Sequence, residues 1–173
     1  AGNIAYWHGN FIPKRNPNFD YTLPVDGSTK ATDWQGRHAL NEIVQSINPS
    51  NGWLQNCNAT PFTVAGDQSP KASNYPAYMA PDGETFRGIN AVRTLQKGGQ
   101  YTLDKIIADG YNNQLPFFEE LIPATVKQFE KSIQNGETKY NSLSEAIQVL
   151  AAWDFTSSEN SIALTLANEL VSC

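Results

Sequence analysis

Residues 48–61 read Asn-Pro-Ser-Asn-Gly-Trp-Leu-Gln-Asn-Cys-Asn-Ala-Thr-Pro, a turn rich in proline and glycine that leads into a short apolar segment. This segment, residues 53–55, is predicted to form a β-strand because it is apolar and is bounded by turn residues. The carboxamides Asn56 and Asn58 follow directly. A strand end is a rigid position, so these side chains can present neutral N–H donors to a substrate. The stretch therefore predicts part of a site that is held by a short β-element.

The composition limits the classes of partner. The chain has 173 residues, of which 40% are apolar, and this suffices for one domain with a core of ordinary size. Its 12 basic and 17 acidic residues give a net charge of -5, which disfavours binding to a phosphate backbone or an anionic lipid surface. No apolar run approaches the roughly 18 residues of a membrane span. We therefore expect neither a nucleic-acid partner nor a membrane partner.

The two cysteines do not form a recognisable motif. Cys57 and Cys173 are too few for a disulfide framework, and they lack the spacing of a zinc site. Their redox state and pairing are left open. Cys57 is one candidate nucleophile with His8 or His38 as its base, but no catalytic signature surrounds it. The simpler interpretation of Cys57 is a small buried residue.

The sequence divides near residue 83 into a loop-rich segment, residues 1–83, and a helical segment, residues 84–173. Most of the prolines lie in the first segment, where their spacing excludes long helices outside residues 24–49. Residues 4–7 are predicted to form a strand after a Gly-Asn turn. The remaining loops are expected to be held in place by aromatic side chains: Phe11, Phe19, Tyr21, Trp34 and Phe62. We expect the two segments to form one compact unit.

In the second segment the apolar residues recur with the helical period. Helices are predicted to begin after Thr85, after Thr102, at Leu115, at Ser142 and near Ser158. Thr102 is expected to cap the second helix, with Asp104 in its first turn, and Ser142 with Glu145 is expected to form a capping box. Pro123 is expected to break the third helix. The predicted fold class is α+β, predominantly helical, with a short and irregular β portion in the N-terminal half.

Short motifs follow one another along the whole chain. They are Gly-Asn-Ile-x-Tyr at residues 2–6, Pro-Lys-Arg at 13–15, Leu-Pro-Val-Asp-Gly at 23–27, Trp-x-Gly at 34–36, the stretch at 48–61, Arg87 with Arg93, and Trp-Asp at 153–154. In order and spacing they resemble the penicillin acylases and acyl-homoserine-lactone acylases, a family of N-terminal-nucleophile hydrolases. The resemblance covers about the whole chain but only a central slice of the family's β subunit. It implies an internal fragment of an αββα hydrolase that carries a helical insertion.

The resemblance also implies a reaction. These enzymes hydrolyse an amide with an N-terminal Ser, whose own α-amino group is the base. Residue 1 here is Ala, so the nucleophile must come from elsewhere and the chain is expected to be inactive alone. The implied partners are the remainder of the β subunit and the α subunit of the same precursor. The implied substrate is a small N-acylated molecule, and the implied location is periplasmic or secreted.

No cofactor is predicted. Members of the family bind a structural calcium, and Asp20 falls beside one matching position. A second carboxylate cannot be placed, because Asp26, Asp67 and Asp82 each lie next to glycine or in turns, where Asp is common. We therefore assign no metal ligand in this chain, and a structural calcium in the intact enzyme is left open.

Asn58 matches the asparagine that supplies the family's oxyanion hole. A neutral carboxamide suits this task because it offers a fixed dipole without a charge that would have to be buried. Two alternatives remain open. Asn58, like Asn56, can instead satisfy backbone groups of the loop. Asn58 also begins the sequence Asn-Ala-Thr, a glycosylation sequon, and a glycan there would block an oxyanion hole.

Arg87 matches the arginine that orients the family's active-site asparagine. Its expected place is the first turns of a helix, where the helix dipole disfavours a cation. The alternative is a surface salt bridge from Arg87 to Asp82 or Glu84. Arg93 lies on another face of the same helix and is interpreted as structural.

A different class of function is also consistent with the composition. A binding module without catalytic activity could present an exposed face of Trp and Tyr to an apolar ligand or a sugar. The positions of Asn58 and Arg87 discriminate between the two hypotheses. The acylase hypothesis requires these side chains to lie together, whereas side chains on opposite faces would remove the predicted site.

Overall fold

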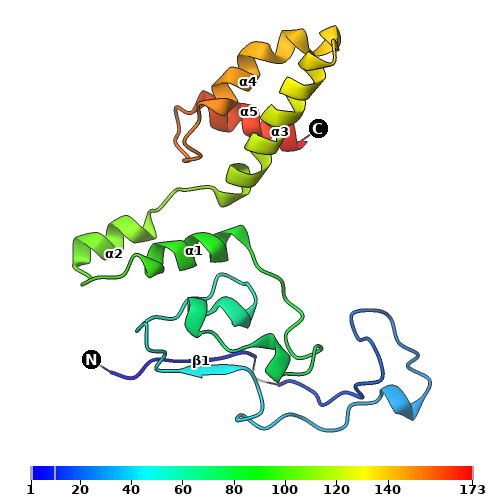
Figure 1. Ribbon diagram of the computed structural model, residues 1–173. Helices are drawn as coiled ribbons and strands as arrows, with labels where there is room; N and C mark the ends of the chain where they lie inside the picture. The colour runs from blue at the N-terminus through cyan, green and yellow to red at the C-terminus, as the bar shows by residue number, and fades with distance from the viewer. Residues whose placement is uncertain (1, 10, 173) are drawn as a thin grey trace. The chain divides into compact units, whose positions relative to one another are not determined.

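The structure is a computed structural model that describes residues 2–9 and 11–172 (Figure 1). Cys173 lies outside the described residues, so the pairing of the two cysteines, which the sequence leaves open, has no structural outcome. The chain forms two compact units, which meet in sequence between Gly98 and Gly99. This division differs from the predicted single unit and from the predicted change at residue 83. Each unit is described by itself below.

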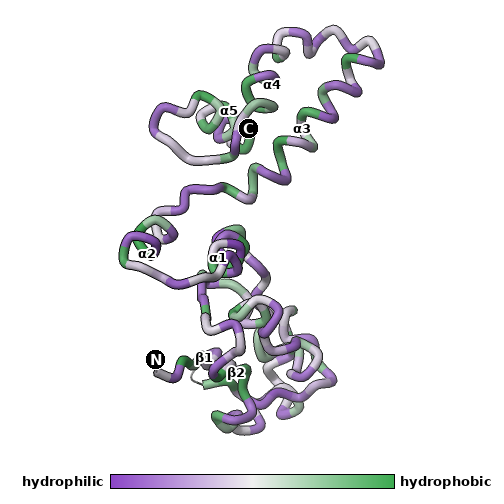
Figure 2. Tube along the Cα trace, turned by 60° about the vertical axis from the view of Figure 1, so that its left-hand side comes forward, coloured by the Kyte–Doolittle hydropathy of each residue, from purple (hydrophilic) through white to green (hydrophobic). Residues whose placement is uncertain are grey.

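The N-terminal unit contains a two-stranded antiparallel sheet, whose two strands are labelled in Figure 2. Strand β1 (Ala5–Trp7) pairs with β2 (Gln45–Ile47), and Tyr6 lies opposite Ser46. The predicted strand at residues 4–7 is thus confirmed. The predicted strand at residues 53–55 is wrong, because this segment is not paired in a sheet.

Residues 53–55 pack against the next loop instead. The backbone N–H of Gln55 donates to the carbonyl oxygen of Val64 at 2.8 Å. The ring of Trp53 lies so close to Gly66 that a Cβ on this glycine would be 3.1 Å from the ring. A turn in which Asn48 and Gly52 both have positive φ separates the segment from β2. Residues 53–55 therefore contact the loop at residues 64–66 instead of pairing as a strand.

Short 3-10 helices and loops make up most of this unit. They are Lys30–Thr32, Pro61–Thr63, Gly66–Gln68 and Ala72–Asn74. The small core consists of Ile43, Val44, Met79 and Ala80, with partly buried neighbours that include Phe62 and Tyr75. Of the aromatic residues expected to hold the loops, Phe11 and Trp34 do not, because they are 75% and 69% exposed.

Helix α1 (Phe86–Gln96) completes the N-terminal unit. Thr85 caps it, since its hydroxyl oxygen accepts from the backbone N–H of Gly88 at 3.0 Å. Gly98 and Gly99, both at positive φ, follow the helix end as expected. Gly88 lies against Ala59. Because α1 packs on the loop-rich segment, the boundary between the units comes after this helix.

The C-terminal unit is helical. It contains α2 (Leu103–Gly110), α3 (Pro116–Gln134), a 3-10 turn (Thr138–Leu143), α4 (Ser144–Ala151) and α5 (Ile162–Ser172). Thr102 caps α2 and Asp104 lies in its first turn, as predicted. The α+β, predominantly helical fold class is confirmed. Among residues 2–9 and 11–172, no helix is both long enough and apolar enough to cross a bilayer.

Three details of these helices differ from the sequence prediction. Helix α3 continues through Pro123, which is exposed, while its neighbour Ile122 is almost completely buried. Packing of the apolar face therefore outweighs the one backbone hydrogen bond that proline removes. Ser142 does not form a capping box, because it lies in the 3-10 turn and α4 begins at Ser144. The last helix begins at Ile162, later than predicted.

The core of the C-terminal unit joins α3, α4 and α5. Its buried members are Phe118, Ile122, Leu150, Trp153, Ala163 and Ala167. The rings of Phe118 and Trp153 lie with their centroids 5.3 Å apart. The indole N–H of Trp153 donates to the carbonyl oxygen of Thr156 at 3.1 Å, so burial of this side chain leaves no donor unpaired.

Asp154 follows Trp153 and forms a local turn that should be measurable by titration. Its carboxylate accepts from the hydroxyl of Thr156 at 2.7 Å and from the backbone N–H of Thr156 at 3.0 Å, and these bonds lower the pKa of Asp154. The stabilisation is present at neutral pH and is lost as the pH falls through the lowered pKa. We expect Thr156→Val to raise the pKa of Asp154 toward its ordinary value, measured by carboxyl NMR. Asp26, which forms the same turn with Ser28, is the control and should not change.

Candidate active site

The loop that carries the carboxamides has an unusual backbone. Asn58 has a φ of 54°, in the left-handed region that asparagine tolerates better than most residues. The side-chain oxygen of Asn56 accepts from the backbone N–H of Asn58 at 2.8 Å. Asn56 therefore forms the turn, and Asn58 is left as the residue whose side chain is available for another contact.

Two hydrogen bonds join the segment that leads into α1 to this loop. The hydroxyl of Thr85 donates to the carbonyl oxygen of Cys57 at 3.3 Å. The backbone N–H of Thr60 donates to the carbonyl oxygen of Gly83 at 2.9 Å. Asn58 lies between Cys57 and Thr60, so the backbone on both sides of Asn58 is hydrogen-bonded to the segment at the start of the helix.

Arg87, in the first turn of α1, contacts Asn58 directly. Its guanidinium Nη2 donates to Asn58 Oδ1 at 3.2 Å, and both residues are exposed. Arginine has only donors, so this contact requires the oxygen of the amide to face Arg87. The NH₂ group of Asn58 must then point away from the guanidinium. No other described residue accepts a hydrogen bond from it, so its donors are available to a ligand.

The alternative partners of Arg87 are engaged elsewhere. The carboxylate of Asp82 lies 3.6 Å from Nε2 of His8. Glu84 accepts from the backbone N–H of Thr85 at 2.8 Å. Within the part of the chain that the structure describes, Arg87 forms no salt bridge with either acid. The two residues predicted from the sequence thus lie together, while their catalytic roles remain a prediction.

The sequence of the chain was also compared with models of known protein families. The sequence model of the penicillin amidase family matches residues 1–173, which is the whole chain. The chain belongs to the penicillin amidase family. It is therefore related to amide hydrolases, and the resemblance predicted from the sequence motifs is confirmed.

A solved structure of the family has a similar fold. The thermostable penicillin G acylase from Alcaligenes faecalis superposes with a TM-score of 0.57 at 22% sequence identity. The match covers 92% of this chain but 26% of that chain. The chain thus spans about a quarter of the length of that acylase. At this identity the similarity is evidence of the fold alone.

The two histidines make local contacts with tyrosine side chains. His8 is hydrogen-bonded to the hydroxyl of Tyr6 at 3.2 Å, and His38 to that of Tyr78 at 3.0 Å. Within the described residues neither imidazole is hydrogen-bonded to the half-buried Cys57, so the hypothesis of a Cys57 nucleophile gains no geometric support. Burial raises the pKa of Tyr6, and the carboxylate of Asp82 adds to this effect.

Metal ligands are not grouped in the described residues. Among residues 2–9 and 11–172 there is no cluster of three or more His, Cys, Asp or Glu side chains that could hold an ion. Asp20 accepts from the hydroxyl and the backbone N–H of Thr22, at 2.6 and 2.9 Å. These two bonds lower its pKa and give it a local structural role.

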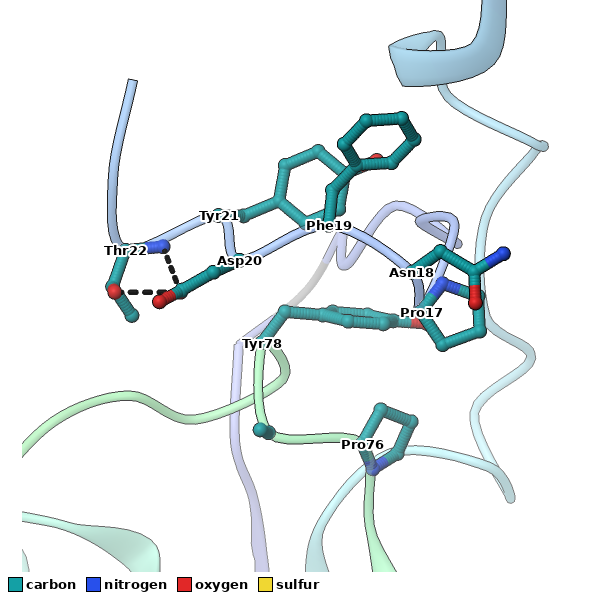
Figure 3. Close-up of a pocket in the computed structure, with 9 residues that line it drawn as sticks. Pro17, Asn18, Phe19, Asp20, Tyr21, Thr22, Pro76 and Tyr78 are labelled. Carbon is teal, nitrogen blue, oxygen red and sulfur yellow. Dashed lines mark hydrogen bonds between the residues drawn. The ribbon is translucent and has the colours of Figure 1, made fainter. Parts of the chain in front are cut away.

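An aromatic cavity lies apart from the candidate site. Its volume is about 520 Å³, and Figure 3 shows the ring of Tyr78 beside Pro17 and Pro76, with Phe19 and Tyr21 nearby. The cavity does not include Asn58 or Arg87. An aromatic surface of this kind is what the binding-module hypothesis requires, and the polar residues Asn18, Asp20 and Thr22 also line it.

Sequence reasoning missed two contributors to the site. Thr85 was expected to lead into a helix, but its hydroxyl bond to Cys57 joins segments 28 residues apart. Gly88 lies buried in the first turn of α1 against Ala59. A glycine inside a helical pattern was the available signal, because such glycines usually mark a close approach.

Proposed function

We propose that this chain supplies the oxyanion donor, and the residue that orients it, to a penicillin-acylase-like amidase. The observation that carries the proposal is the 3.2 Å hydrogen bond from Arg87 to Asn58. It fixes the orientation of a carboxamide whose N–H groups can then donate to the substrate oxygen that becomes negative when the acyl carbon is attacked. Membership of an amide hydrolase family supports this assignment.

The two residues have distinct roles in this mechanism. Asn58 donates to the oxyanion, a bond that strengthens as negative charge develops and so lowers the barrier rather than only binding substrate. Arg87 withdraws electron density from the amide oxygen through a charge-assisted hydrogen bond and prevents the amide from turning over. The N-terminus of α1 adds a positive potential near the same position.

The rest of the enzyme is part of the proposal. The nucleophile is an N-terminal Ser outside this chain, and the chain is inactive without it. Its partners are the remainder of the β subunit and the α subunit of the same precursor, and the enzyme is periplasmic or secreted. The substrate is a small N-acylated molecule; penicillins, acyl-homoserine lactones and lipopeptides are the candidate classes. No cofactor is required for this chemistry.

Replacing Arg87 tests the positioning role. In the mature enzyme that contains this chain, we expect Arg87→Ala to lower kcat about 10- to 100-fold, because a hydrogen bond to a charged group contributes about 1.5–3 kcal/mol. The measurement is steady-state hydrolysis of a panel of N-acyl p-nitroanilides. Arg37→Ala is the control, since Arg37 is exposed and lies over the ring of Phe11.

The same experiment can reject the proposal. If the mature enzyme does not release an acyl group from any N-acyl amide, the reaction class is wrong. If Arg87→Ala and Arg37→Ala have the same activity as the unmodified enzyme, the assigned role of Arg87 is wrong.

A further inference from the structure

Gly88 occupies a position where glycine is unfavourable. It lies in the first turn of α1, and glycine is among the least favourable residues in a helix. Its backbone does not have a positive φ, so the conformation itself does not require glycine. Gly88 is buried, whereas its neighbour Arg87 is exposed. A close approach by another segment is the remaining physical reason for a glycine here.

That segment is the loop that carries Asn58. A Cβ at position 88 would be 3.1 Å from the Cβ of Ala59 and 3.3 Å from the hydroxyl oxygen of Thr85, and it would also meet the carboxylate of Glu84. The Glu84 side chain is exposed and can rotate away, although it then gives up its hydrogen bond from the backbone N–H of Thr85. Ala59 is 7% exposed and cannot move independently, because Cys57 and Thr60 are both hydrogen-bonded to the start of α1.

Two neighbouring pairs therefore meet across this contact. Gly88 faces Ala59, and Arg87 donates to Asn58. The 3.2 Å bond from Arg87 to Asn58 is already at the long end of the range for an N–H···O hydrogen bond. A separation of the helix and the loop by a few tenths of an ångström would weaken or break this bond.

We infer that Gly88 is a positioning residue, whose missing side chain sets the distance between α1 and the loop at which Arg87 can orient the Asn58 amide. The inference rests on the proposed function of Asn58. It adds a residue that contacts neither the substrate nor the reacting atoms and that acts through the backbone. Thr85 supports the same geometry, because its hydroxyl links the loop and the helix end.

The test uses the mature enzyme and an N-acyl p-nitroanilide. We expect Gly88→Ala to lower kcat about 10-fold with KM changed less than about threefold, because a small misplacement of a catalytic group mainly affects the transition state. The matched control is Gly110→Ala in α2, where an added Cβ meets no atom within 4 Å. This control should keep the activity of the unmodified enzyme.

A double-mutant cycle shows whether Gly88 acts through Asn58. In an Asn58→Ala background, Gly88→Ala should cause no further loss, because the group that it positions is absent. An equal loss in both backgrounds, or no loss in Gly88→Ala alone, would overturn the inference. If Asn58→Ala itself keeps full activity, the proposed function fails instead, and the two failures are thus distinguishable.

A compensating variant covers the case in which Gly88→Ala does not fold. Ala59→Gly removes the only atom of the loop that the new Cβ would meet among its three nearest neighbours, so the pair Ala59→Gly with Gly88→Ala relieves the contact between the loop and the helix, while the contacts with Glu84 and Thr85 remain. We expect this double variant to fold and to recover at least a third of the kcat that Ala59→Gly alone retains. A double variant that folds but remains as impaired as Gly88→Ala, or that fails to fold, would contradict the steric basis of the inference.

Discussion

Replacing Asn58 with alanine is expected to lower the kcat of the mature amidase by about 10²- to 10³-fold, with little change in KM. The reason is that, in the proposed mechanism, the amide N–H of Asn58 makes its full contribution only when the carbonyl oxygen of the substrate has become negative. Loss of one such donor corresponds to roughly 3–4 kcal/mol of transition-state stabilisation. Steady-state hydrolysis of N-acyl p-nitroanilides measures both constants.

The variant Asn58→Asp separates a donor role from a structural role. Aspartate has nearly the same size and would keep an acceptor for Arg87, but its ionised carboxylate cannot donate to an oxyanion. We therefore expect Asn58→Asp to be at least as impaired as Asn58→Ala. If Asn58→Asp retained activity while Asn58→Ala lost it, the contact with Arg87 would matter only for the structure of the loop.

The helices were largely predictable because their signals are local. The caps formed by Thr85 and Thr102 depend on residues within one turn, and both are present in the structure. The errors arose where tertiary contacts override a local preference. Pro123 lies inside α3 because the helix is stabilised through its buried face, and β2 was missed because it follows the buried pair Ile43 and Val44 rather than an alternating pattern.

The residues of the candidate site could be proposed from the sequence, but their geometry could not. Asn58 and Arg87 could be selected from the family motifs, yet they lie 29 positions apart, with mainly loops and 3-10 turns between them. Periodicity gives no distance across such a segment. The contacts that bring them together, from Thr85 to Cys57 and from Gly88 to Ala59, depend on one hydroxyl and one missing side chain. Only the three-dimensional structure shows that these small features serve the same contact.

Replacing Ile122 with alanine is expected to lower the free energy of unfolding of the helical unit by about 2–5 kcal/mol. Ile122 is 1% exposed and belongs to the core that Phe118 and Trp153 share with α4 and α5. Truncation removes its buried methyl and methylene groups and leaves a cavity that helices fixed on several sides can close only in part. Amide hydrogen exchange in α3 and α4, followed under native conditions, measures this unit separately from the N-terminal one.

The matched control lies on the same helix. Ile133 is also in α3 but is 37% exposed, so Ile133→Ala removes the same atoms from a position that water already reaches. We expect its effect to be about 1 kcal/mol or less, because little cavity forms at a partly exposed site. If both variants lowered the stability equally, the loss would reflect helix propensity or the unfolded chain rather than core packing. A large effect confined to Ile122 would instead show that the buried face of α3 holds the helix together across Pro123.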